Sequence, residues 1–168
     1  MTNDLQKRVI FGAIALAIFT PFLLAGGMAF QFFVGLLAMI ATAELIKMRR
    51  LAPNSIEGVL AMLASLVLTL PLQNYLTFLP TDGNYTAYAI VVFLLLGATV
   101  FNIGRYNYSD VVFPIASSFY VGIGFHSLVL ARMDGLNKVF FALCLVWATD
   151  IGAYMIGRQF GRRKLLPK

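Results

Sequence analysis

Residues 147–168 read WATDIGAYMIGRQFGRRKLLPK, and this stretch joins the end of an apolar run to a basic cluster. Asp150 lies within the apolar part, and a carboxylate near the centre of a membrane helix costs about 2.5–3.5 kcal/mol. Such an acid usually faces a polar cavity or a charged partner. At helical spacing Asp150, Tyr154 and Arg158 stack on one face. The stretch therefore predicts a membrane helix with one polar face beside a basic end.

The composition extends this interpretation to the whole chain. Of the 168 residues 60% are hydrophobic and only 12% are charged, with a mean hydropathy of +0.84. Soluble domains are about 45–50% apolar and about 25% charged, so the chain has the composition of a membrane protein. No polar stretch is long enough for a second, soluble domain. We expect a single membrane domain over residues 1–168, embedded in a lipid bilayer.

The apolar runs predict an all-α fold, a polytopic integral membrane bundle of about six transmembrane helices. A spanning helix needs about 20 mostly apolar residues. The predicted spans are 9–24, 29–46, 59–79, 87–103, 111–130 and 139–156, followed by a basic tail at 157–168. Turn-forming residues separate them, such as Gly26 and Gly27 after the first span.

The basic residues predict the orientation of these spans. With six spans only Arg132 and Lys138 fall on one side of the membrane. The remaining cations fall on the other side: Lys7, Arg8, Lys47, Arg49, Arg50, Arg105, Arg158, Arg162, Arg163, Lys164 and Lys168. Loops rich in Lys and Arg stay in the cytoplasm, so both termini are predicted to be cytoplasmic. The same rule explains the net charge of +6 without a nucleic-acid partner.

The motif content excludes several kinds of site. The chain has no G-x-x-x-x-G-K-[ST], no H-E-x-x-H, no C-x-x-C and no G-x-S-x-G. With a single histidine and a single cysteine, a His/Cys metal centre is close to excluded. Only carboxylates remain as ligands, and they favour a hard cation such as Mg²⁺.

The polar face at residues 150–164 has a functional and a structural interpretation. Asp150 is a candidate catalytic and metal-binding residue, or a structural acid that pairs with an arginine such as Arg158 or makes a hydrogen bond at a helix contact. Tyr154 is a ligand contact or an interfacial aromatic anchor. Arg162 and Lys164 suit phosphate oxygens, although a basic cluster also anchors topology and attracts anionic lipid.

Three further features are weighed in the same way. His126 is expected to pack between helices rather than to relay protons. Glu44 lies one turn before Lys47, so an ion pair at a helix end is expected. Gly157 and Gly161 form a G-x-x-x-G, which is compatible with close helix packing and leaves a homodimer open.

The C-terminal stretch resembles a segment of the phosphatidate cytidylyltransferases (CDP-diacylglycerol synthases), which is written D-x-x-A-Y-x-x-G-[RK]-x-F-G-[KR]-x-K-L-x-P. The matching positions are Asp150, Ala153, Tyr154, Gly157, Arg158, Phe160, Gly161, Arg162, Lys164, Leu165 and Pro167. The match is specific in this segment and diffuse elsewhere, where a basic start and an apolar run ending in Glu44 are also similar.

The resemblance implies transfer of a cytidylyl group from CTP to phosphatidate in phospholipid biosynthesis, in the cell (plasma or inner) membrane. It implies Mg²⁺ or another divalent cation as cofactor, with Asp150 near the metal. It also implies that Tyr154, Arg158, Arg162 and Lys164 contact the substrates. In the family this segment is followed by further helices and a signature with metal-binding acids, so an incomplete fragment is expected.

Two other functions fit the residues without the resemblance. A small transporter or channel would line a path with Asp150 and His126. A non-catalytic membrane scaffold would use the helices for packing alone. Magnesium-dependent CTP binding would favour the transferase, and ion-coupled flux would favour the transporter.

Overall fold

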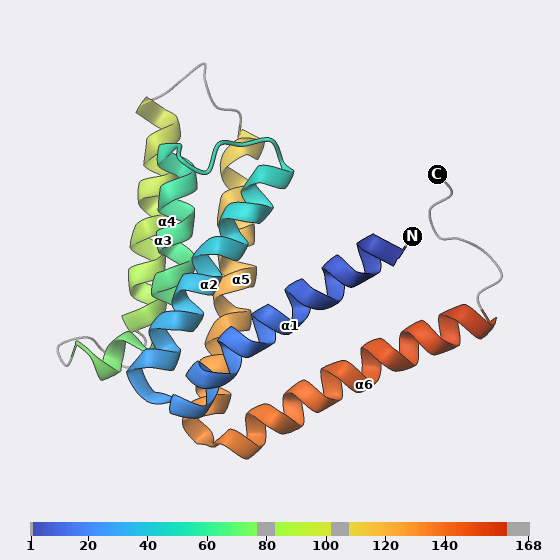
Figure 1. The fold of residues 1–168 in the computed structure, drawn as a ribbon. Coiled ribbons are helices and arrows are strands. Elements are labelled where there is room, and N and C mark those ends of the chain that lie inside the picture. Colours follow the sequence, from blue (N-terminus) through green and yellow to red (C-terminus); the bar gives the residue numbers. More distant parts are fainter. Residues whose placement is uncertain (1, 77–82, 102–107, 161–168) are drawn as a thin grey trace.

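The computed structural model describes residues 2–76, 83–101 and 108–160, and the regular elements in these ranges are all helical. The chain runs through six α-helices and one short 3₁₀ helix there (Figure 1). Their bounds are Thr2–Ala25 for α1, Gly27–Met48 for α2, Ile56–Thr69 for α3, Leu72–Asn74 for the 3₁₀ helix η1, Gly83–Phe101 for α4, Tyr108–Asp134 for α5 and Leu136–Phe160 for α6. The predicted all-α fold is confirmed.

Helix α3 is the centre of the fold. It packs against α2, α4 and α5, and α2 also packs against α5. These four helices stand side by side as a bundle, whereas α1 and α6 slope away from it (Figure 1). Helix α1 joins the bundle through α2, and α6 joins it through α5. The polar face predicted on the last helix therefore lies on a helix outside the four-helix bundle.

Small residues allow the central helices to approach closely. A Cβ atom added at Gly122 of α5 would lie 2.9 Å from the Cβ of Leu68 on α3. A Cβ added at Gly35 of α2 would lie 2.7 Å from the Cδ1 of Leu66 on the same helix α3. Close backbone approach at small residues is how helices associate in membranes, where burial of apolar surface gives little driving force.

Within the residues that the structure describes, three helices are long and apolar enough to span a membrane. They cover Gly27–Met48, Asp110–Asp134 and Leu136–Gly157, and shorter apolar helices cover Ile10–Ala25, Ile56–Thr69 and Gly83–Ala98. Large apolar side chains face outward, such as Phe93 at 73% exposure and Phe141 at 71%. An apolar exterior suits lipid, and the chain is a multi-pass membrane protein. Of the six predicted spans, three therefore meet both the length and the hydropathy of a membrane helix within the described residues.

Each α-helix begins before its predicted span, and α1, α2, α5 and α6 also end after it. Helix α1 begins at Thr2 instead of residue 9, and α6 continues to Phe160 instead of residue 156. Hydropathy marks where a segment leaves an apolar environment, whereas a helix continues through good helix formers such as Lys7 and Arg158. Arg158 is therefore helical and not part of a tail.

The predicted third span is wrong at its C-terminal end. It was expected to reach residue 79, but α3 ends at Thr69. Pro71 cannot donate a backbone hydrogen bond, and it disfavours the helical conformation of the preceding residue; Leu70 is accordingly extended, with φ −79° and ψ 137°.

Side chains from other helices satisfy the backbone where α3 ends. The amide of Asn84 on α4 donates to the carbonyl oxygens of Val67, at 3.4 Å, and Leu70. Its Oδ1 accepts from the N–H of Leu72 at 3.0 Å. A helix end at membrane depth is stable only when its backbone groups find such partners.

The turn between α1 and α2 is held by a side chain of α5. Gly26 and Gly27 have φ of 64° and 56°, the left-handed region that glycine adopts most readily. Arg132 donates from Nε to the carbonyl oxygen of Leu23 at 2.7 Å and from Nη2 to that of Leu24 at 3.1 Å. The guanidinium thereby caps the C-terminal carbonyls of α1, and the separation of the first two helices at this turn is confirmed.

Candidate functional site

Helix α6 carries the described part of the candidate site. Asp150 and Tyr154 are one turn apart and both are exposed, Tyr154 by 66%. Arg158 follows one turn later in the same helix. Arg162 and Lys164 lie outside the described residues. The backbone of α6 thus places an acid, a phenol and a base on one helix face, as the spacing predicted.

No second element covers Asp150 in the part of the chain that the structure describes. The first turns of α6 pack on the bundle, where Val139 is fully buried beside Val129 of α5. Farther along, the helix slopes away (Figure 1), and from Cys144 to Gly157 every residue except Gly152 is exposed. Asp150 and Tyr154 are therefore accessible to a ligand, and a single helix supplies both.

Asp150 has no ion-pair or hydrogen-bond partner among the described side chains, where the ion pairs are Glu44–Lys47 and Asp134–Lys138. The structural interpretation of Asp150 required a partner such as Arg158, whose side chain is not among those that the structure describes. An exposed carboxylate in an apolar helix can accept hydrogen bonds and bind a cation.

Asp150 can supply one ligand to Mg²⁺. No group of three His, Cys, Asp or Glu side chains is close enough for a metal within the described ranges. Mg²⁺ is commonly bound by one or two carboxylates, several waters and the phosphate oxygens of a substrate. One accessible carboxylate fits a cation that arrives with a nucleotide, and it does not fit a cage built from protein alone.

His126 and Glu44 both make contacts with other residues of the helical fold. Nδ1 of His126 lies 3.1 Å from the carbonyl oxygen of Thr69, at the end of α3. This contact joins α5 to α3, and the prediction that His126 packs between helices is confirmed. Glu44 and Lys47 form the expected ion pair at 2.7 Å, and both side chains are exposed.

Glu57 is a buried acid that the sequence did not indicate. It lies in the first turn of α3, 3% exposed, and neither carboxylate oxygen has a hydrogen-bond partner within the described ranges. Ser55 caps the same helix by accepting from the N–H of Gly58 at 3.1 Å. A Ser followed by an acid is an ordinary helix start that is usually solvated, so only the packing reveals the burial.

Comparison with known proteins relates the whole chain to one family. The sequence profile of the cytidylyltransferase family matches residues 6–168. The phosphatidate cytidylyltransferase of Staphylococcus saprophyticus is 38% identical over 163 residues, and that of Staphylococcus haemolyticus is 37% identical over 163 residues. The Staphylococcus aureus enzyme of the same name is 33% identical.

The matches cover a larger share of this chain than of its relatives. Each alignment covers 97% of this chain and 62% of the relative, so the chain spans about 62% of the length of the curated relatives that it matches. No solved structure matches. The resemblance read from residues 150–168 is confirmed over nearly the full chain, and the chain belongs to the cytidylyltransferase family.

Proposed function

We propose that this chain takes part in transfer of the cytidylyl group of CTP to phosphatidate, which yields CDP-diacylglycerol and pyrophosphate. The observation that carries the proposal is the polar face of α6, in which Asp150 and Tyr154 are exposed and Arg158 follows at helical spacing. This face lies within the segment that resembles phosphatidate cytidylyltransferases, and the relatives bear that name.

The reaction joins two anions, and this determines what the residues must do. A phosphate oxygen of phosphatidate attacks the α-phosphorus of CTP, a new P–O bond forms, and the bond to the leaving pyrophosphate breaks. Arg158, Arg162 and Lys164 offset the repulsion by binding phosphate oxygens through charge-assisted hydrogen bonds. Cations held in place where charge develops also stabilise the leaving group.

Asp150 and Tyr154 complete the proposed set. Asp150 would hold Mg²⁺, and the cation would supply neutralisation of charge on the triphosphate. Tyr154 contacts the substrate from the same face, through a hydroxyl that donates or accepts a hydrogen bond.

The proposed location is the cell membrane, with both termini in the cytoplasm. This orientation puts the basic end of α6 at the surface where soluble CTP meets a lipid headgroup. A homodimer through Gly157 and Gly161 is proposed as well; an added Cβ at Gly157 would meet no described atom within 4 Å, which leaves room for a second helix at that position, while Gly161 lies outside the described residues.

Incorporation of labelled CTP into lipid tests the proposal. The purified chain receives phosphatidate and Mg²⁺, beside Asp150→Asn and the S. saprophyticus relative as positive control. We expect Mg²⁺-dependent CTP binding by the chain, and any labelled lipid it forms to fall on the order of 10²-fold with Asp150→Asn because a site charge is lost. Undiminished transfer by Asp150→Asn would contradict the role of Asp150. Absence of both transfer and Mg²⁺-dependent CTP binding, with an active control, would contradict the function.

A further inference from the structure

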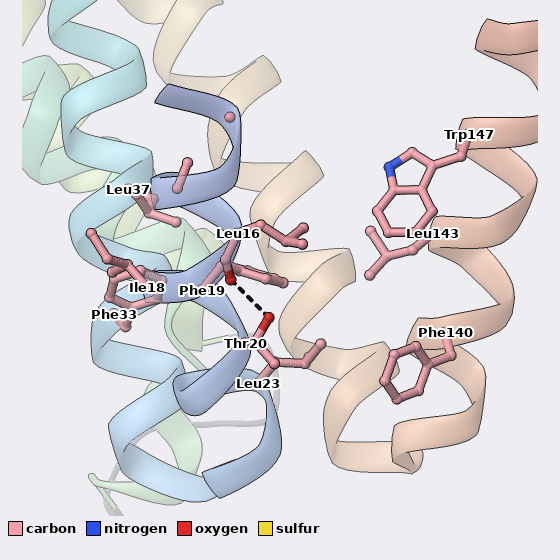
Figure 2. Close-up of a pocket in the computed structure, with 12 residues that line it drawn as sticks. Leu16, Ile18, Phe19, Thr20, Leu23, Phe33, Leu37, Phe140, Leu143 and Trp147 are labelled. Atoms are coloured by element: carbon pink, nitrogen blue, oxygen red, sulfur yellow. Dashed lines mark hydrogen bonds between the residues drawn. The ribbon is translucent and has the colours of Figure 1, made fainter. Parts of the chain in front are cut away.

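An apolar groove runs between α1 and α6 (Figure 2). Its volume is about 660 Å³, within the range of about 300–1,000 Å³ of small-molecule sites. Leu16 and Phe19 line it from α1, and Leu143 and Trp147 line it from α6. The one hydroxyl in the lining, that of Thr20, donates to the carbonyl oxygen of Leu16 at 2.7 Å. Besides this hydroxyl, the indole N–H of Trp147 is the one polar side-chain group in the lining, and the rest of the groove offers hydrocarbon contact.

Small residues on α1 help to keep the groove open. Gly12 and Ala15 are part of its lining. A Cβ atom added at Gly12 would meet no other atom within 4 Å. The space at this position is therefore unfilled by protein, and a larger side chain there would enter the groove without displacing another residue.

The groove and the candidate site lie on the same face of α6. Phe140, Leu143 and Trp147 line the groove, and Asp150 and Tyr154 continue the same spacing of three and four residues. At a rise of about 1.5 Å per residue, Trp147 lies about 16 Å along the helix from Arg158. One face of α6 is thus apolar near Trp147 and basic at Arg158. The distance between them is close to half the thickness of a bilayer core, which is about 30 Å.

We propose that this groove seats the distal part of one acyl chain of the acceptor lipid, while the lipid phosphate lies toward Arg158. The inference rests on the proposed function and adds where the lipid binds. The complementarity is twofold: a phosphomonoester meets the basic end of α6, and a hydrocarbon chain meets the apolar groove. An acyl chain held in this way limits the positions that the phosphate can take before transfer.

The chain contains a built-in probe for this proposal. Trp147 is the only tryptophan and lines the groove. Bromine atoms on a lipid chain quench tryptophan fluorescence on contact. The protein is reconstituted in phosphatidylcholine vesicles with brominated phosphatidate or, at equal mole fraction, with brominated phosphatidylcholine. We expect stronger quenching by brominated phosphatidate, stronger still when the bromines are near the chain end, and reversal by unlabelled phosphatidate.

Three variants define the site. Gly12→Leu fills the groove and is expected to abolish the difference between the two lipids, as is Ala15→Phe. Gly97→Leu on α4 is the matched control, because an added Cβ there also meets nothing within 4 Å, and it should keep the difference. Arg158→Gln should lose the preference for phosphatidate because it removes the charge that holds the headgroup.

Equal quenching by both lipids would overturn the inference, since it would mean ordinary solvation by bilayer lipid. Quenching by neither lipid would overturn it as well, because protein would then cover the groove. The labelled-CTP assay is run on the same samples. Transfer without selective quenching contradicts the acyl-chain seat alone, whereas selective quenching without transfer contradicts the proposed function and leaves the lipid site standing.

Discussion

The polar side chains inside this helical fold bind backbone carbonyls more than they bind one another. Arg132 caps the end of α1, while His126 and Asn84 serve the end of α3. Each contact joins two helices, because the cap comes from another part of the chain. In an apolar surrounding an unsatisfied carbonyl costs several kcal/mol, so these residues stabilise the fold where helices stop. Asp150 differs from them, since it is exposed and has no described partner.

Arg132→Met tests this role at a single residue. Methionine keeps much of the side-chain length but leaves the carbonyls of Leu23 and Leu24 without their donors. We expect a loss of about 1–3 kcal/mol in the free energy of unfolding, measured by denaturant unfolding in detergent. Lys138→Met is the control, because its 2.8 Å ion pair with Asp134 is exposed and such pairs contribute about 0–1 kcal/mol. Equal effects of the two variants would contradict the capping role.

At the scale of elements, the four bundle helices and the two sloping helices differ in how they are packed. In α5 Gly122 faces α3 at close range, whereas Gly124, two residues later, faces open space. In α6 only the first turns are packed, and just 6% of its most apolar stretch is buried. Packing density is therefore concentrated around α3, and the helix with the candidate site is free to contact lipid or substrate.

The glycine pair of α5 offers a matched test of this packing. Gly122→Leu would force a side chain against Leu68, whose Cβ lies 2.9 Å from an added Cβ, whereas Gly124→Leu meets nothing within 4 Å. We expect Gly122→Leu to lower the free energy of unfolding by about 1–3 kcal/mol through overpacking. Gly124→Leu should be neutral or slightly stabilising because it also removes a helix glycine. Thermal unfolding in detergent measures both, and a reversed order would contradict the α3–α5 contact.

At the scale of the whole molecule, the orientation in the membrane decides where the candidate site meets its substrates. The loop between α2 and α3 and the turn between α5 and α6 belong to opposite ends of the bundle (Figure 1). The first contains Arg49 and Arg50, and the second is near Arg132 and Lys138. The excess of cations predicts that the α2–α3 loop is cytoplasmic.

Site-directed labelling measures this orientation. In a Cys144→Ser background, single cysteines replace Asn54 in the α2–α3 loop or Asn137 at the start of α6, both of which are exposed. We expect a membrane-impermeant maleimide to label the cysteine at 54 only in inside-out vesicles and the cysteine at 137 only in right-side-out vesicles. The opposite pattern would invert the topology and would remove the candidate site from cytoplasmic CTP.

Much of the fold follows from the sequence because local physics determines it. An apolar run of about 20 residues must be helical in lipid, since no other conformation satisfies its own backbone, and the turn at Gly26 and Gly27 is marked by residues that tolerate positive φ. The spacing of Asp150, Tyr154 and Arg158 on one helix face is equally local. The family was evident from residues 150–168 for the same reason, because that pattern is contiguous.

Only the tertiary structure decided the features that depend on residues far apart in the chain. Helix α3 stops at Thr69 because Pro71 breaks it and because Asn84 and His126, from later helices, satisfy its end. The burial of Glu57 and the groove beside Trp147 likewise arise where separate helices meet. Hydropathy and spacing describe one helix at a time, whereas burial, capping across helices and the shape of a groove are properties of their packing.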